Sequence, residues 1–214
     1  SHCHILDPRG FAYASDVAYR PAGQETGSAD YFAHVLDAYG VRHALLVGPN
    51  SGYGADNGCM LDAIARGNGR FKGIAVVPND EGTTRLQEFK ARGVIGIAFN
   101  LALHGLDHYS NIAPLLARLA ALDMFVQVQF DGEQMHDLAP MLRDSGARLL
   151  IDHCGRPDAA AGVAGKGFAA VLGLADTGRA TVKLSGFSKF SVQPFPFADT
   201  RPYITALMQA FGPD

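Results

Sequence analysis

The stretch from residue 148 to residue 157 reads Arg-Leu-Leu-Ile-Asp-His-Cys-Gly-Arg-Pro, and it indicates the fold of this chain most directly. Its apolar run is short and continuous, which is typical of a strand that is buried on both faces of a parallel sheet. The run ends abruptly in Asp152 and His153, and Gly-Arg-Pro then signals a loop. Enzymes built from β/α units keep their sites at such strand ends. The stretch therefore predicts a strand that delivers His153 to a functional loop.

Similar apolar runs alternate with helical patterns along the chain, as expected of a sheet built from β/α units. The helical stretches carry end signals, for example Ser28 before an apolar face and Gly40 after it. We expect helices between Ser28 and Gly40, after Ser110, between Gly132 and Gly146, and from Pro202 to Phe211. The expected strands are residues 2–6, 43–47, 73–77, 94–100, 124–130, 148–153 and 180–185.

Seven β/α units fit either a doubly wound open sheet or a (β/α)8 barrel that lacks one unit. No G-x-G-x-x-G motif follows the first strand, and polar residues gather after several strand ends, so the barrel is favoured. We predict the α/β class and a distorted (β/α)8 TIM-type barrel, with residues 1–214 forming a single domain. The chain is shorter than the roughly 250 residues usual for this fold. We therefore expect strand 8 and part of strand 1 to lie outside the sequence.

Composition narrows the classes of partner. The chain has 18 Lys plus Arg against 21 Asp plus Glu, a formal net charge of -3, which disfavours nucleic acid. No apolar run approaches the roughly 18 residues of a spanning helix, and the start carries no signal pattern. The three cysteines lack C-x-x-C spacing and are interpreted as reduced thiols. We expect a cytoplasmic protein with no nucleic-acid or membrane partner, and a homo-oligomer remains open.

His2 and His4 form the strongest local signal for chemistry. In a strand, residues i and i+2 project to the same face, about 6 to 7 Å apart, so both can reach one ion or one substrate. The alternative is a pair of histidines satisfied by backbone carbonyls at the rim. In either case, alternation along the strand would point Cys3 the other way, into the core.

Other strand ends are polar as well, and several polar groups converging on one rim favour a ligand over independent loop caps. Gln127 and Gln129 share a face of their strand and are expected to point inward. A buried Lys183 would need a carboxylate, which could come from the substrate or from a salt bridge within the fold. Asp152 is expected on the face opposite His153, where it could orient a neighbouring group.

The motifs together resemble a known family. They are H-C-H-I-L-D-P, L-L-V-G-P-N-S-G-Y-G-A-D-N, G-V-I-G-I-A-F-N, L-L-I-D-H-C-G-R-P-D and V-K-L-S-G-F-S-K, in this order along essentially the whole chain. They resemble the amidohydrolase-2 group of the amidohydrolase superfamily, in the branch that includes 2-pyrone-4,6-dicarboxylate lactonase and sugar lactonases. The resemblance implies a distorted (β/α)8 barrel and a hydrolase that opens the ring ester of a small lactone by adding water.

The resemblance also implies roles for individual residues. The catalytic histidines around the carbonyl would be His2, His4 and His153. A strand-8 aspartate, in a motif like G-x-D-W-P-H that we expect beyond Asp214, would activate the water. Substrate contacts would come from Tyr19, Ser51, Asn100, Gln129 and Lys189. The resemblance leaves two options for a cofactor: none, or one divalent metal ion, zinc first, held by His2 and His4.

The sequence departs from the family pattern where arginines are expected. Ile95 and Ala98 stand at two such positions around the fourth strand, and Lys189 replaces a third arginine. Fewer guanidinium groups favour a neutral or singly charged lactone, or a related carboxylic acid, as the small-molecule partner. The alternatives are a metal-dependent decarboxylase of the same group, if an acidic ligand such as Asp7 joins the site, and a catalytically inactive barrel that binds a small acid or sugar.

Overall fold

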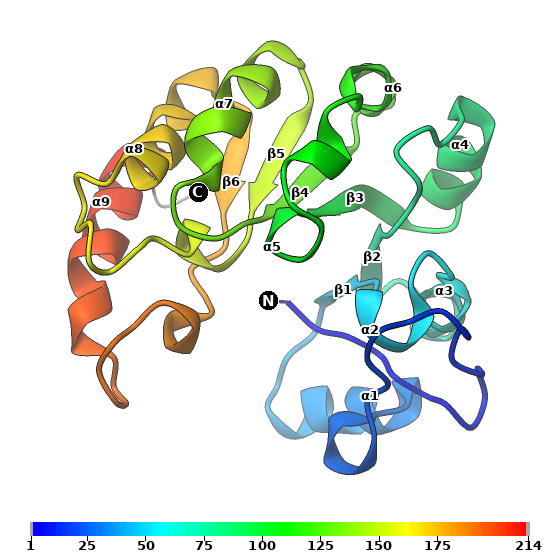
Figure 1. Cartoon of the computed structure of the whole chain (residues 1–214). Coiled ribbons are helices and arrows are strands. Elements are labelled where there is room, and N and C mark those ends of the chain that lie inside the picture. The colour runs from blue at the N-terminus through cyan, green and yellow to red at the C-terminus, as the bar shows by residue number, and fades with distance from the viewer. Residues whose placement is uncertain (1, 213–214) are drawn as a thin grey trace. The chain divides into compact units, whose positions relative to one another are not determined.

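The computed structural model describes residues 2–212. They fall into two compact units, one ending at Ala98 and the other starting at Phe99, in which strands alternate with helices (Figure 1). The strands are β1 (Ala44–Val47), β2 (Phe71–Ala75), β3 (Val94–Asn100), β4 (Phe125–Gln129), β5 (Arg148–Ile151) and β6 (Ala180–Val182). The helices are α1 (Ala29–Ala38), α2 (Asn50–Tyr53), α3 (Gly58–Arg66), α4 (Thr83–Ala91), α5 (Leu101–His104), α6 (Ala113–Ala121), α7 (Gln134–Asp144), α8 (Lys166–Gly173) and α9 (Arg201–Phe211).

The first unit pairs β1, β2 and β3 in parallel, with Leu46 opposite Gly73 and Gly73 opposite Val94. Helix α3 packs closely on β2, because a Cβ atom at Gly73 would lie 2.7 Å from the Cδ1 atom of Ile64. Helix α1 begins as predicted, since the Oγ atom of Ser28 accepts a hydrogen bond from a backbone amide in its first turn.

The prediction of a strand over residues 2–6 is wrong. Cys3 forms a single parallel bridge to Leu46, and Leu6 forms an antiparallel bridge to Gly27. The segment does not continue along β1, because Leu6 pairs with Gly27 instead. A turn then follows, in which the carboxylate of Asp7 accepts a hydrogen bond from the backbone amide of Gly10 at 3.3 Å. The described residues 2–212 thus contain six strands rather than seven.

The second unit pairs β4, β5 and β6 in parallel, with Val128 opposite Ile151 and Ile151 opposite Val182. Helices α7, α8 and α9 lie side by side in this unit (Figure 1). Side chains from strands and helices share its core, as expected of a strand layer covered by helices. Fully buried members are Val126, Leu149, Ile151, Val171 and Leu207.

The carboxyl ends of the strands differ most from the expected ranges. β5 stops at Ile151 rather than residue 153, and β6 stops at Val182 rather than residue 185. A 3-10 turn, η3 (His153–Gly155), follows β5. His153 and Cys154 have φ angles of 50° and 58°, which no strand adopts. Within residues 2–212, the helices are all too short or too polar to cross a membrane.

Candidate functional site

The histidine pair of the first unit is held close together. The Nε2 atoms of His2 and His4 are 3.2 Å apart, and the two rings meet edge to face with centroids 4.8 Å apart. The Nδ1 atom of His4 lies 2.8 Å from the carbonyl oxygen of Val47, at the end of β1. A carbonyl can only accept, so Nδ1 of His4 carries the proton, and in the neutral ring Nε2 presents its lone pair toward His2.

This geometry fits one metal ion. Two imidazole nitrogens that bind one tetrahedral zinc at 2.0–2.1 Å lie about 3.3 Å apart. The Nε2 atoms of His2 and His4 are 3.2 Å apart, which is close to this separation. Metal-binding histidines usually donate their other ring N–H to a carbonyl or carboxylate, as His4 does to Val47. The same pair can also donate a hydrogen bond, if His2 or His4 carries a proton on Nε2. The side chains therefore suit both options that the sequence leaves open.

Ser51 and Tyr19 are neighbours through Gly52. The amide of Gly52 donates to the carbonyl of Tyr19 at 2.9 Å, and Gly52 has a φ angle of 78°. A Cβ atom at Gly52 would lie 2.7 Å from the ring of Tyr13, so only glycine fits this loop. The loop after β1 that contains Ser51 therefore lies beside the segment that contains Tyr19, and substrate contact by these two residues stays a prediction.

The hydroxyl of Tyr19 is already engaged. It donates to the carboxylate of Glu25 at 2.6 Å, and this bond raises the pKa of Tyr19 and lowers the pKa of Glu25. The side chain is half exposed. A substrate contact by Tyr19 would therefore use the ring face, or the oxygen as an acceptor.

His153 is the centre of the second unit's candidate site. Its Nδ1 atom lies 3.1 Å from the Oγ atom of Ser185, and its ring covers Gly186 so closely that a Cβ atom there would be 2.7 Å from three ring and side-chain atoms. The I-D-H motif and the K-x-S-G motif, far apart in sequence, thus meet at His153. The left-handed backbone of His153 stores strain, which is common at functional sites.

Asp152, Lys183 and Gln127 form a buried cluster behind this turn. The Nζ atom of Lys183 is 2.8 Å from Oδ1 of Asp152, and it also donates to Oε1 of Gln127. The strand register explains the pairing, because Ile151 lies opposite Val182 and the next two residues are therefore neighbours. Of the two partners expected for Lys183, the carboxylate within the fold is the one observed.

Cys154 is a free thiol, as expected, and its surroundings make it unreactive. It is fully buried, and burial raises the pKa of its thiol to about 11, so the reactive thiolate is scarce at neutral pH.

Asn100 and Gln129 lie at the ends of β3 and β4. Asn100 caps helix α5, since its Oδ1 atom accepts a hydrogen bond from the backbone amide of Leu103 at 3.1 Å. The backbone amide of Asn100 donates to the hydroxyl of Tyr109 at 2.8 Å. Burial raises the pKa of Tyr109 to about 12. The side chain of Gln129 is partly exposed, whereas Gln127 is buried. Substrate contact by Asn100 and Gln129 stays a prediction.

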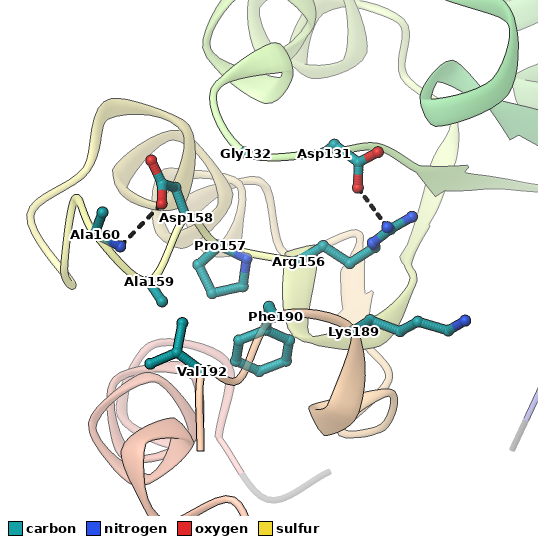
Figure 2. Close-up of a pocket in the computed structure, with 10 residues that line it drawn as sticks. All are labelled: Asp131, Gly132, Arg156, Pro157, Asp158, Ala159, Ala160, Lys189, Phe190 and Val192. Carbon is teal, nitrogen blue, oxygen red and sulfur yellow. Dashed lines mark hydrogen bonds and ion pairs between the residues drawn. The ribbon is translucent and has the colours of Figure 1, made fainter. Parts of the chain in front are cut away.

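A pocket of about 460 Å³ opens beside the His153 turn, and Lys189 lies in its wall (Figure 2). Arg156, which sequence reasoning did not single out, lines the same pocket and pairs with Asp131 at 2.7 Å. Phe190 and Val192 supply apolar wall. The lining also contains the carboxylates of Asp131 and Asp158, and Asp131 neutralises Arg156. Lys189 is therefore the lining cation best suited to an acid group of a small molecule.

The histidine pair belongs to the first unit and His153 to the second, so their meeting in one site stays a prediction. In the first unit a hydrogen bond holds His4 at the end of β1, and in the second unit His153 follows β5 after one residue and is held by Ser185 and Gly186. Polar residues at the ends of parallel strands, with helices between the strands, are typical of (β/α) enzymes.

Comparisons with known proteins identify the family of this chain. A profile of the amidohydrolase family matches residues 1–214. The 4-sulfomuconolactone hydrolase of Rhizobium radiobacter is 29% identical over 221 residues, which cover 100% of this chain and 71% of that protein. The chain therefore belongs to the amidohydrolase family, as its motifs predicted.

Solved structures confirm the fold class. A protein of Pseudomonas putida, provisionally named as a 2-pyrone-4,6-dicarboxylic acid hydrolase, is 31% identical with a TM-score of 0.82, and the match covers 99% of this chain and 77% of that one. An Acinetobacter baumannii structure with the same provisional name holds citric acid; it is 26% identical with a TM-score of 0.76, over 98% of this chain and 75% of that one. The TIM-type barrel class predicted from the strand and helix order is thus confirmed.

Proposed function

We propose that the protein hydrolyses the ring ester of a small lactone. The observation that carries the proposal is His153, an imidazole fixed by Ser185 and Gly186 at the end of β5 in a family whose named relatives include lactone hydrolases. The reaction adds water across the carbonyl carbon and the ring oxygen, so one C–O bond forms, one C–O bond breaks and a hydroxy acid results.

His153 is proposed to stabilise the carbonyl oxygen as negative charge develops on it. A donor fixed before the reaction begins needs no reorganisation in the transition state, which is why such groups are effective. The contact to Ser185 engages Nδ1, and Nε2 is the ring nitrogen that we propose acts on the substrate. The histidine pair, His2 and His4, is proposed to act on the same carbonyl group.

His2 and His4 would also be the residues that hold a divalent ion, where one is bound. The ion would supply Lewis-acid polarisation of the carbonyl. The two options are distinguished by measuring the metal content of the purified protein and of the His4→Asn variant. A stoichiometric ion that is lost in the variant supports the metal option, whereas a metal-free and fully active protein supports direct polarisation by the histidines.

Lys189 is proposed to bind an acid group of the substrate in the pocket beside His153, with Ser51, Asn100, Gln129 and the ring of Tyr19 as further contacts. Activation of water is a role that the resemblance gives to an aspartate motif that does not occur among the 214 residues.

Lactones with at most one acid group are expected to be the best substrates. Ile95 and Ala98 stand where the family pattern supplies arginines, and an aliphatic side chain cannot pair with a second carboxylate. The test compares kcat/KM for pyrone, muconate and aldonate lactones that differ in the number of acid groups. A clear preference for the pyrone dicarboxylate would contradict this expectation.

A further inference from the structure

The cluster of Lys183, Asp152 and Gln127 buries two charged side chains, and their desolvation opposes folding. The side chain of Asp152 is 0% exposed and that of Lys183 is 9% exposed. Removing two charges from water costs several kcal/mol per ion, and apolar residues of similar size often serve a fold equally well. Stability alone therefore gives a weak reason for an ion pair at this position.

The cluster is connected to His153 through Lys183. The carbonyl oxygen of Lys183 accepts hydrogen bonds from the backbone amides of Cys154 and Ser185, both at 2.9 Å. Cys154 follows His153 directly, and the hydroxyl of Ser185 contacts the Nδ1 atom of His153. One residue thus fixes the backbone after the imidazole and the side chain that orients it.

The turn at His153 needs such support. His153, Cys154, Gly155 and Arg156 all have positive φ angles, of 50°, 58°, 76° and 39°. A left-handed conformation disfavours residues with a Cβ atom, so it persists only where the surroundings impose it. The side chain of Lys183 holds Asp152 at the start of this turn, while its carbonyl holds Cys154 within it.

We infer that Lys183, through its buried ion pair with Asp152, is a positioning residue that sets the orientation and tautomer of His153. The inference rests on the proposed function for its consequence on turnover. Its structural core, the control of the His153 ring, is measurable without any substrate.

The test uses three variants of the whole protein: Lys183→Met, Asp152→Leu and the double variant. Each single variant leaves one buried group without its partner and should lower the melting temperature strongly. The double variant removes both charges and should recover much of that stability. Nitrogen NMR of the His153 ring then reports its tautomer, and steady-state kinetics on the preferred lactone report kcat and KM separately.

We expect the double variant to be folded, with a His153 ring that exchanges between tautomers. Its kcat should fall by about 10- to 100-fold with little change in KM, on the scale of losing a group that orients a functional ligand. A double variant with the parental tautomer and parental kcat would overturn the inference and leave the ion pair a purely structural role.

A milder variant, Gln127→Met, keeps the ion pair and removes only the acceptor of one Lys183 hydrogen bond. If the double variant does not fold, Asp152→Asn decides the question, because it keeps an oxygen acceptor for Lys183 and removes the charge of the ion pair. A changed His153 tautomer in Asp152→Asn, with a smaller change or none in Gln127→Met, supports the inference, and an unchanged tautomer in Asp152→Asn contradicts it. Thr200→Val is the control, because Thr200 is a buried polar residue of the same unit whose hydroxyl bonds only the carbonyl of Phe197 among the described contacts. It should lower stability without changing His153.

If the parent protein opens no lactone, the proposed function fails, yet the tautomer measurement still tests the positioning by Lys183.

Discussion

Replacing His153 with asparagine is expected to lower kcat/KM for lactone opening by about 10²-fold or more, the scale of losing one fixed donor to a developing oxyanion. Asparagine is too short to place a donor where Nε2 of the imidazole lies. It can still face Ser185, so the fold should persist. Because the lost interaction belongs to the transition state, the effect should appear mainly in kcat.

His136→Asn is the matched control for this prediction. His136 is an exposed histidine on α7, so the same substitution there should leave kcat/KM unchanged. A His153→Asn protein that turns over lactone at the parental rate would remove His153 from the mechanism.

Gly186→Ala is expected to damage both stability and turnover. Gly186 has a φ angle of 69°, and a left-handed residue with a Cβ atom costs about 1–2 kcal/mol. The new methyl group would also lie 2.7 Å from His153 and must displace its ring. A shift of about 1 Å in a catalytic group can cost about 10²-fold in rate.

Gly178→Ala separates these two effects. Gly178 has a φ angle of 63°, but a Cβ atom there would meet nothing within 4 Å. Thermal unfolding and kcat/KM should be measured for both variants. Gly178→Ala should show only the backbone cost, with full activity, whereas equal activities in the two variants would show that contact with Gly186 does not position His153.

Much of the fold could be predicted from local pattern. β3 has the expected bounds, and α1 and α9 begin within a residue of the expected starts, since Ser28 caps the first and Pro202 lies in the first turn of the second. Helix α6 begins at Ala113, three residues after Ser110, because Pro114 fits its first turn. Apolar runs and end signals are short-range features, so they suffice for element positions.

The candidate site was predicted less completely. Alternation along a strand predicted that Asp152 and His153 face opposite ways, but β5 has already ended at Ile151 and the left-handed turn sets both directions. The partner of Lys183 depends on the register between β5 and β6, which no local pattern contains. A polar residue at a strand end can contact a substrate or cap the next helix, and the sequence does not distinguish these roles. Asn100, predicted as a substrate contact, caps helix α5. The one signal for Arg156 was its place in the G-R-P motif after His153.

The assignment of lactone hydrolysis is tested most directly by incubating the purified protein with its preferred lactone in water enriched in oxygen-18. The account predicts that the ring opens with one heavy oxygen entering the new acid group and one proton released for each ring. Release of carbon dioxide would indicate the decarboxylase instead. Saturable binding of the lactone without any ring opening would contradict the account and identify an inactive ligand-binding barrel.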